Sequence, residues 1–288
     1  MCGFAGFYAG KWGFNSTDIC KNMLKKLHHR GPDDSGIWVS NEDDVTFGHV
    51  RLSIQDLSSA GHQPMASLCG RYIIVFNGEI YNHKDIRKEL SSINYSIKWN
   101  GHSDTETLVS AISVWGVEES IKRCVGMFAF AIWDKFKHEL ILGRDRLGEK
   151  PLYYGWQGNT FLFGSELKAL REHPSFLNVI NRDALCLFFR HNTIASPHSI
   201  YKGIYKLLPG SVLYLRKGSN EPIINKYWSI KSVAENGNSN LFVGNEKEAL
   251  ISLEHTMSQA VSGQMISDVP LGAFLSGGVD SSIVTSLM

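Results

Sequence analysis

Several features that would define a class of protein are scarce or missing in this sequence of 288 residues. The five cysteines, at positions 2, 20, 69, 124 and 186, form no CxxC pair, which excludes a disulfide framework and a zinc site and fits a reducing compartment. The most apolar stretch, GMFAFAIW at 126–133, is far shorter than the ~20 residues of a membrane helix. The N-terminal stretch MCGFAGFYAGKWGF has no basic leader. We therefore predict a cytoplasmic location, without export or membrane contact.

An excess of charge of one sign is also lacking. The 29 Lys and Arg residues nearly balance the 28 Asp and Glu residues, and the net charge of +1 predicts no nucleic-acid partner. Apolar residues make up 43% of the chain and charged residues 20%, as in globular proteins with a sizeable core. At the usual ~150 residues per domain, the length predicts two domains or one large one.

Short apolar runs separated by turn signals dominate the chain up to residue 215. Five of them are typical of strands in antiparallel hairpins: 71–76, 128–134, 139–145, 151–156 and 160–165. Three segments have helical periodicity: 18–29, 83–90 and 103–116. In the last of these, Ser103 and Glu106 have the spacing of a capping box. The mixture predicts an α+β domain.

The composition changes in the last quarter of the chain. Residues 216–245 are rich in Gly, Asn and Ser and predict a linker or an irregular wrap. Asn245 then precedes a helical pattern, with Glu248 at the capping-box position. The apolar run DVPLGAFL, 268–275, is typical of a buried parallel strand. Because SGGVDSS and an apolar helix start follow, 246–288 predicts the first strand, loop and helix of an α/β unit.

The glycine pair in SGGVDSS suits a phosphate-binding loop. Gly277 and Gly278 would let backbone N–H groups approach an oxyanion, and the N-terminus of the helix would add its positive end. Ser276 and Ser281 would add hydroxyl donors. Two glycines alone are equally compatible with a tight strand-to-helix turn. The full SGGxDS string, however, resembles the pyrophosphate loop of ATP-pyrophosphatases, enzymes that activate a carboxylate by adenylating it, and this favours phosphate binding.

Cys2 is the second feature with distinctive chemistry. If Met1 is removed, Cys2 carries a free α-amino group beside its thiol, and such an amine can act as the base for the nucleophile. A lone cysteine is otherwise more often a small buried apolar residue. Its context decides, because a series of stretches resembles the class II glutamine amidotransferases among the N-terminal-nucleophile hydrolases, and in particular the glutamine-dependent asparagine synthetases. These stretches are MCGFAGFY, HRGPDDSGIW, GHVRLSIQDLSSAGHQPM, FNGEIYNH, SDTETLV, GMFAFAIWD, GRDRLGEKPLYY, FGSELKAL and FLSGGVDSS.

The resemblance implies a glutaminase site. Cys2 would attack the side-chain amide of glutamine, form a thioester and release ammonia. The Asn77 side-chain amide and the Gly78 backbone N–H would stabilise the oxyanion. Taken by themselves, Asn77 and Gly78 predict a type I′ hairpin turn, and we expect this turn to aim the two donors.

The same resemblance implies how glutamine is recognised. Arg51 would bind the α-carboxylate with its guanidinium, and Glu79 and Asp104 would hold the α-ammonium group. Taken singly, either carboxylate is more often a member of a surface ion pair. Main-chain groups of the segment after Arg51 would complete the contacts: Leu52, Ser53, Ile54 and Gln55. Two further stretches match the family, and we expect structural roles for both. Residues 29–33 would shape the pocket. A second set of residues would form buried or half-buried ion pairs: Arg144, Asp145, Arg146 and Lys150.

The two ends of the chain together imply one reaction. ATP, with Mg²⁺, would adenylate aspartate or another carboxylate acceptor, and ammonia from the glutaminase would convert the activated acyl group to an amide. The resemblance implies no tightly bound cofactor and leaves a homodimer of the full-length protein open. The incomplete ATP site would comprise Leu275, Ser276, Gly277, Gly278, Asp280 and Ser281. Family members continue well beyond this loop, so we expect a fragment that alone is competent only for glutamine hydrolysis.

The expected organisation has three parts. Residues 1–215 would form the glutaminase domain, a four-layer αββα sandwich of the N-terminal-nucleophile hydrolase fold, followed by a linker at 216–245. Residues 246–288 would begin an incomplete ATP-pyrophosphatase domain. Three alternatives stay open. The first is a related ligase that amidates a sugar acid, a peptide or a β-lactam precursor. The second is a non-catalytic binding protein with this fold, and the third is a cysteine hydrolase that acts on another amide.

Overall fold

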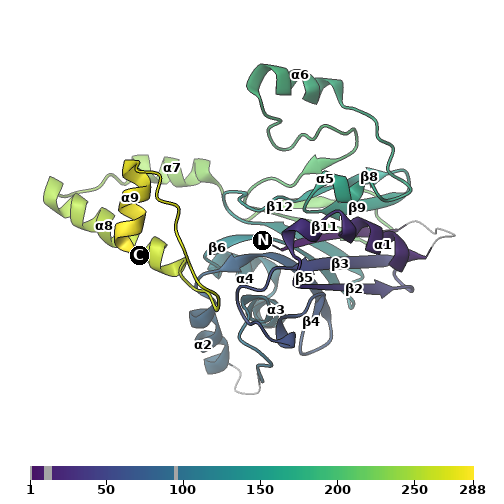
Figure 1. Ribbon diagram of the computed structural model, residues 1–288, viewed down its shortest axis with the longest axis horizontal. Helices are drawn as coiled ribbons and strands as arrows, with labels where there is room; N and C mark the ends of the chain where they lie inside the picture. The colour runs from purple at the N-terminus through teal and green to yellow at the C-terminus, as the bar shows by residue number, and fades with distance from the viewer. Residues whose placement is uncertain (1, 10–14, 94–96) are drawn as a thin grey trace.

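The structure is a computed structural model that describes residues 2–9, 15–93 and 97–288. Two antiparallel six-stranded sheets form its centre (Figure 1). The first sheet has the order β10-β8-β9-β1-β3-β2, with β1 at Gly3–Tyr8, β2 at Asp34–Ser40, β3 at Val45–Arg51, β8 at Tyr153–Gln157, β9 at Thr160–Gly164 and β10 at Tyr205–Lys206. The second has the order β12-β11-β7-β6-β5-β4, with β4 at Met65–Ala66, β5 at Tyr72–Ile80, β6 at Gly126–Asp134, β7 at Glu139–Arg144, β11 at Ser211–Arg216 and β12 at Ile223–Lys226.

An apolar layer between the two sheets forms the main core. Successive side chains of a strand point to opposite faces, so in β5 Ile73 and Val75 pack in this layer while Ile74 packs on the other side of its sheet. Trp133 of β6 and Phe163 of β9 are fully buried members of the same layer. Because both faces of these strands are covered, their sequences are continuous apolar runs rather than alternating patterns.

Helices cover both outer faces of the sandwich. On the second sheet, an apolar cluster joins β5 and β6 to three helices: α2 at His83–Ile93, α3 at Asp104–Trp115 and α4 at Val117–Arg123. On the first sheet, another joins β1 and β3 to two helices: α1 at Ser16–Lys25 and α5 at Leu167–Leu170. The helix α6 (Arg182–His191) stands away from these layers (Figure 1). The predicted αββα layering is therefore confirmed, as are all the strands and helices predicted up to residue 215.

Two local predictions are wrong. Asn77 and Gly78 do not form a hairpin turn, because they lie inside β5 and pair with Ala129 and Phe128 of β6. The turn signal is overridden by the long ladder with β6, which extends to Ile80.

The capping box at α3 is only half formed. The Ser103 side chain accepts a hydrogen bond from Glu106 N, as predicted. The Glu106 carboxylate does not return the bond and instead accepts from the N–H groups of Asn100 and Gly101, while forming an ion pair with Arg87. The preceding loop therefore competes successfully for the carboxylate.

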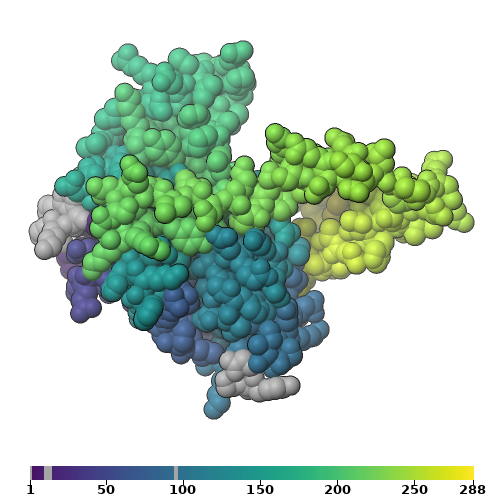
Figure 2. All heavy atoms as spheres, turned by 180° about the vertical axis from the view of Figure 1, so that it is seen from behind, coloured from purple at the N-terminus to yellow at the C-terminus, as the bar shows by residue number. Residues whose placement is uncertain are grey.

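The last quarter of the chain differs in character from the sandwich. The segment 216–245 is not a plain linker, because it contains β12, which pairs with β11 at the edge of the second sheet, and α7 (Ile230–Ser239). Helix α8 (Glu246–Gly263) begins with the predicted capping box, in which Asn245 and Glu248 exchange both hydrogen bonds. Helix α9 is formed by Val279–Leu287. Seen from behind, the region of α7, α8 and α9 projects from the body of the molecule (Figure 2).

The strand predicted at 268–275 is absent from the described residues of the structure. This segment has no regular secondary structure, and Phe274 within it is fully exposed. A parallel strand needs neighbouring strands on which to form its ladder, and none of the described strands pairs with it. No helix within the described ranges combines the length and the apolar character needed to span a membrane.

Candidate active site

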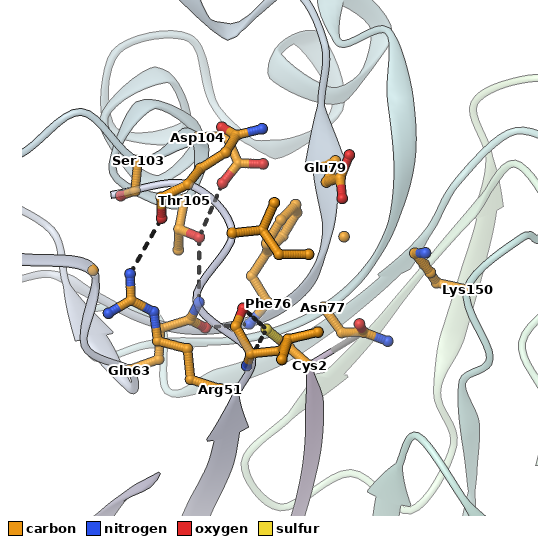
Figure 3. Close-up of a pocket in the computed structure, with 15 residues that line it drawn as sticks. Cys2, Arg51, Gln63, Phe76, Asn77, Glu79, Ser103, Asp104, Thr105 and Lys150 are labelled. Atoms are coloured by element: carbon orange, nitrogen blue, oxygen red, sulfur yellow. Dashed lines mark hydrogen bonds between the residues drawn. The ribbon is translucent and has the colours of Figure 1, made fainter. Parts of the chain in front are cut away.

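A cavity lies at the end of the sandwich, where β1 begins and β5 passes it (Figure 3). Cys2 precedes β1, and Asn77 lies in β5 at a position whose side chain points to the same inter-sheet side as Val75. The two residues therefore meet from opposite sheets. The cavity is lined by Cys2, Arg51, Leu52, Ile54, Gln55, Gly61, Gln63, Phe76, Asn77, Gly78, Glu79, Ser103, Asp104, Thr105 and Lys150.

The thiol of Cys2 is held against the segment that follows β3. Leu52 N lies 3.4 Å from the sulfur as a donor, and the thiol lies 3.6 Å from Leu52 O. Burial raises the pKa of the thiol, although the Leu52 N–H opposes this shift. The Cys2 carbonyl accepts a hydrogen bond of 2.9 Å from Arg30 Nε, which holds the backbone of the residue in place. A buried, protonated thiol needs a base before it can attack a carbonyl.

The free edge of β5 supplies the backbone groups of the cavity. In an antiparallel strand alternate N–H groups point to one edge, so those of Phe76, Gly78 and Ile80 share an edge. The Phe76 N–H donates to Gln63 Oε1 at 2.6 Å, and the Ile80 N–H donates to Asp104 Oδ2 at 2.9 Å. The Gly78 N–H lies between these two bonds, at a residue that lines the cavity.

Glycine is required at position 78 by the neighbouring strand. A Cβ atom there would overlap Met127 O and lie 2.7 Å from Phe128 Cα, both in β6. Any larger residue would therefore push β5 away from β6 and displace the N–H group that faces the cavity.

The side-chain amide of Asn77 is the second donor. Asn77 is 1% exposed, and its Nδ2 has no hydrogen-bond partner among the described residues. A buried amide nitrogen without a partner costs free energy, so its retention indicates a ligand atom that accepts its hydrogen bond. Asn77 and Gly78 both line the cavity that contains the Cys2 thiol, so each brings a hydrogen-bond donor to its wall.

Arg51 brings a positive charge to the wall of the cavity. It ends β3, and its guanidinium donates to the carbonyl groups of Ser58 (3.0 Å), Gln55 (3.3 Å) and Asp56. A Cβ atom at Gly61 would overlap the guanidinium, which shows how closely this loop encloses it. The loop carbonyls thus fix the orientation of the guanidinium.

Two carboxylates lie on the side of the cavity away from Cys2 (Figure 3). Burial raises the pKa of Asp104 to about 6, although hydrogen bonds from Ile80 N and Thr105 stabilise its charged form. Burial also raises the pKa of Glu79, and the nearby Lys150 partly offsets this shift. Within the described part of the chain neither Asp104 nor Glu79 forms an ion pair, and this favours a cationic ligand group at this end.

The structure brings together nearly all the residues predicted for glutamine binding. Ser53 alone among them does not line the cavity, and its N–H donates instead to Asp33 Oδ2 at 2.7 Å. Sequence analysis missed Gly61, Gln63, Phe76, Ser103, Thr105 and Lys150. Several of these residues lie in GHQPM and SDTETLV, which belong to the stretches that resemble the family. This resemblance could have indicated them as site residues.

Within the described residues Arg144, Asp145 and Arg146 do not form the predicted ion pairs. Arg144 donates to the carbonyl groups of Lys150, Leu207 and Gly148, and Asp145 accepts from backbone N–H groups, among them that of Lys150. Arg146 donates to Lys122 O. These residues stabilise loops through the backbone, and their loop brings Lys150 to the cavity.

The predicted phosphate loop forms a separate group of residues at the start of α9. Gly278 is the N-cap of this helix, and Gly277 has a φ of +80°, which glycine adopts without strain. The hydroxyl groups of Ser276 and Ser281 lie 3.0 Å apart. Leu275 and Asp280 flank this turn, and all six predicted residues are exposed or nearly so and lie outside the cavity with Cys2.

Comparison with known proteins gives two family matches. A model of the glutamine amidotransferase domain matches residues 1–228, and a model of asparagine synthase matches residues 252–288. Glutamine-hydrolyzing asparagine synthetase 3 of Bacillus subtilis is 37% identical over 292 residues, which cover 100% of this chain and 45% of that protein. Glutamine-hydrolyzing asparagine synthetase 1 of the same organism is 34% identical over 292 residues, covering 100% of this chain and 44% of that protein.

A solved structure shows the same fold at low sequence identity. The glutamine phosphoribosylpyrophosphate amidotransferase from B. subtilis, complexed with ADP and GMP, superposes with a TM-score of 0.59 and 19% identity over 80% of this chain and 50% of that chain. The chain spans less than half the length of the two curated relatives named above.

Proposed function

The chain belongs to the family of glutamine amidotransferase domains, and from this premise we propose that it hydrolyses glutamine to glutamate and ammonia with Cys2 as the nucleophile. The observation that carries the proposal is that Cys2, Asn77 and Gly78 line one cavity and that the buried Asn77 Nδ2 has no hydrogen-bond partner among the described residues. A nucleophile beside an oxyanion hole is what acyl transfer from an amide requires.

The proposed reaction has two stages. The Cys2 sulfur attacks the side-chain amide carbon of glutamine, and its proton passes to the α-amino group that Cys2 would expose after loss of Met1, a residue outside the described ranges. Asn77 and Gly78 stabilise the oxyanion. As it collapses to the thioester, the α-ammonium group of Cys2 passes its proton to the departing nitrogen, which leaves as ammonia. Water then attacks the thioester through a second oxyanion and releases glutamate. The raised pKa of the thiol keeps it protonated until the amine accepts the proton.

The proposed recognition of glutamine uses both walls of the cavity. Arg51 binds the α-carboxylate with the guanidinium N–H groups that the loop carbonyls leave available, and these carbonyls already orient the guanidinium. Asp104 and Glu79 bind the α-ammonium group. Main-chain groups of Leu52, Ile54 and Gln55 complete the contacts, whereas Ser53 lies outside the cavity with its N–H bonded to Asp33. The cavity would thus bind both charged groups of an amino acid, the α-carboxylate and the α-ammonium group.

For the longer protein we propose a second reaction, ATP-dependent amidation of aspartate to asparagine with the ammonia released at Cys2. The match of residues 252–288 to asparagine synthase and the names of the relatives support it. The turn formed by Leu275, Ser276, Gly277, Gly278, Asp280 and Ser281 would bind the phosphates of Mg²⁺-ATP, because its glycines and serines sit at a helix N-terminus. We place this reaction in the cytoplasm, in keeping with the free cysteines of the chain.

We also propose a revised domain boundary. The glutaminase domain would end after β12, near residue 228, rather than at residue 215, because β12 pairs with β11 and the family match extends that far. The synthetase domain would then begin with α8, joined by the segment that contains α7.

The test is an assay of ammonia release from glutamine, with mass spectrometry of the N-terminus. We expect the chain that has lost Met1 to release ammonia and Cys2→Ala to lose at least about 10³-fold in rate, since removing a nucleophile removes its whole catalytic unit. Cys186→Ala, at an exposed cysteine of α6, is the matched control and should retain full activity. Absence of ammonia release from a chain shown to begin at Cys2 would exclude the proposal.

A further inference from the structure

Gln63 is a buried amide at the cavity to which the glutaminase reaction above assigns no role. It is 4% exposed, lines the cavity and lies two residues before β4. Both ends of its amide are hydrogen bonded to groups on different elements of the fold. A fully paired buried amide rigidifies the elements that it joins.

The carbonyl end of Gln63 completes the edge of β5. The short strand β4 pairs with β5 at Ile73 and Ile74, so the same register places Gln63 opposite Phe76. At this point Gln63 contributes its side chain rather than its backbone, and its Oε1 accepts the Phe76 N–H at 2.6 Å. The bond fixes the backbone directly before Asn77 and two residues before Gly78.

The amide nitrogen of Gln63 reaches the other end of the cavity. Its Nε2 donates to Thr105 Oγ1 at 3.2 Å, and the Thr105 hydroxyl donates to Asp104 Oδ1 at 3.4 Å. Figure 3 shows the continuous path from Phe76 through Gln63 and Thr105 to Asp104. Only an amide of this length supplies both an acceptor and a donor, because glutamate lacks the donor and asparagine is one methylene shorter.

We propose that Gln63 is a positioning residue for glutamine hydrolysis, which sets the spacing between the oxyanion donors at Asn77 and Gly78 and the carboxylate of Asp104. Asp104 also accepts the Ile80 N–H, so Gln63 and Asp104 hold the N–H groups on both sides of Gly78. The distance between the oxyanion and the α-ammonium group is a property of glutamine. Gln63 thus makes the cavity selective for the length of this substrate, and the inference rests on the glutaminase function proposed above.

The test compares Gln63→Glu with a matched control. Gln63→Glu keeps the size of the side chain and the acceptor for the Phe76 N–H but loses the donor to Thr105. Gln157→Glu alters another buried glutamine, which bonds Leu177 N and Lys202 O away from the cavity. We measure kcat and KM for ammonia release, and the Kd for glutamine by calorimetry in a Cys2→Ala background.

We expect Gln63→Glu to raise KM and Kd about ten-fold, the effect of one weakened bond to a charged group, with kcat changed less than about three-fold. Gln157→Glu should lower the melting temperature without changing KM. Thr105→Val removes the hydroxyl group that links Gln63 to Asp104. The double variant Thr105→Val/Gln63→Glu should therefore have a Kd less than about three-fold above that of Thr105→Val alone. If Gln63→Glu does not fold, Gln63→Met provides the same comparison of Kd.

The outcomes separate the two proposals. A KM unchanged in Gln63→Glu, with loss of thermal stability like that of Gln157→Glu, would make Gln63 a structural residue and overturn the inference. Additive effects of Gln63→Glu and Thr105→Val on Kd would also overturn it, since the path would not pass through Thr105. Failure of the parent Cys2→Ala chain to bind glutamine at all would instead contradict the proposed function.

Discussion

The sandwich and the C-terminal region of this chain contain similar local signals but very different burial. Helix α3 of the sandwich buries nine consecutive residues, Asp104 to Ile112, whereas no residue of α7, α8 or α9 is buried. Yet α8 begins with a complete capping box and α3 with only half of one. Capping and periodicity are properties of a short segment, while burial depends on a partner surface. In this molecule, therefore, a helix with good local signals does not have to be part of a core.

The two regions meet at Asp268, next to the candidate active site. Its carboxylate accepts a hydrogen bond of 2.7 Å from Asp56 N and lies 2.7 Å from the ring of His102, while its own N–H donates to Ile54 O at 2.9 Å. Asp56 belongs to the loop that holds Arg51, and His102 lies two residues before Asp104. The exposed region thus contacts two loops that line the cavity containing Cys2.

The largest expected effect tests the difference in burial itself. Phe163→Ala, at a fully buried position between the sheets, should lower the free energy of unfolding by about 3–5 kcal/mol because it leaves a cavity. The fully exposed Phe274 is the matched residue in the C-terminal region. Phe274→Ala should change the free energy of unfolding by less than about 0.5 kcal/mol. Urea denaturation followed by tryptophan fluorescence measures both. Equal losses would show that Phe274 has a partner surface in solution.

A second prediction contrasts a buried carboxylate with an exposed one. Burial raises the pKa of Asp104 to about 6, whereas the hydrogen bond with His102 lowers the pKa of the exposed Asp268. Under the proposed function Asp104 must be ionised to bind the ammonium group of glutamine, so affinity should fall about five-fold from pH 6 to pH 5. Glu79, whose pKa burial also raises, should add to this fall. Calorimetry with the Cys2→Ala chain measures the Kd across this range.

The raised pKa of Asp104 also determines how the stability of the protein changes with pH. The ordinary pKa of Asp104 is 3.8 and the folded value is about 6, so the folded state binds this proton more tightly than the unfolded state. The contribution of Asp104 to the free energy of unfolding should therefore decrease as pH rises from about 4 to about 6. Asp104→Asn should abolish this step and weaken glutamine binding at pH 7. A step in Kd that persists in Asp104→Asn would assign the titration to another group.

The smallest expected effect asks whether the exposed region influences the buried site. Asp268→Asn keeps the shape of the side chain but weakens its bonds to Asp56 and His102, and should raise KM for glutamine about two- to three-fold. Asp280→Asn, an exposed carboxylate in the phosphate loop, is the control and should leave KM unchanged. Identical KM values for the two variants would show that the contact at Asp268 does not support the cavity.

Prediction from the sequence succeeded where the signal was local or carried by a family resemblance. Cys2, Arg51 and Asp104 belong to matching stretches, and the structure places all three at one cavity. It failed at Gln63, which has no chemical signal of its own, because the role of an amide depends on which backbone groups lie around it. It failed also at Asn77 and Gly78, whose turn signal yields to the ladder with β6.

The sequence by itself determined the strands and helices, the caps at Ser103 and Asn245, and the chemical groups available to a glutaminase, because these depend on residue type and short-range spacing. The tertiary structure alone decided which groups face each other. It joined the start of β1 to the middle of β5, left the N–H of Gly78 between two occupied neighbours, and left 268–275 without a sheet. The physical reason is that strand pairing and burial are made between distant segments, whose partners no local pattern specifies.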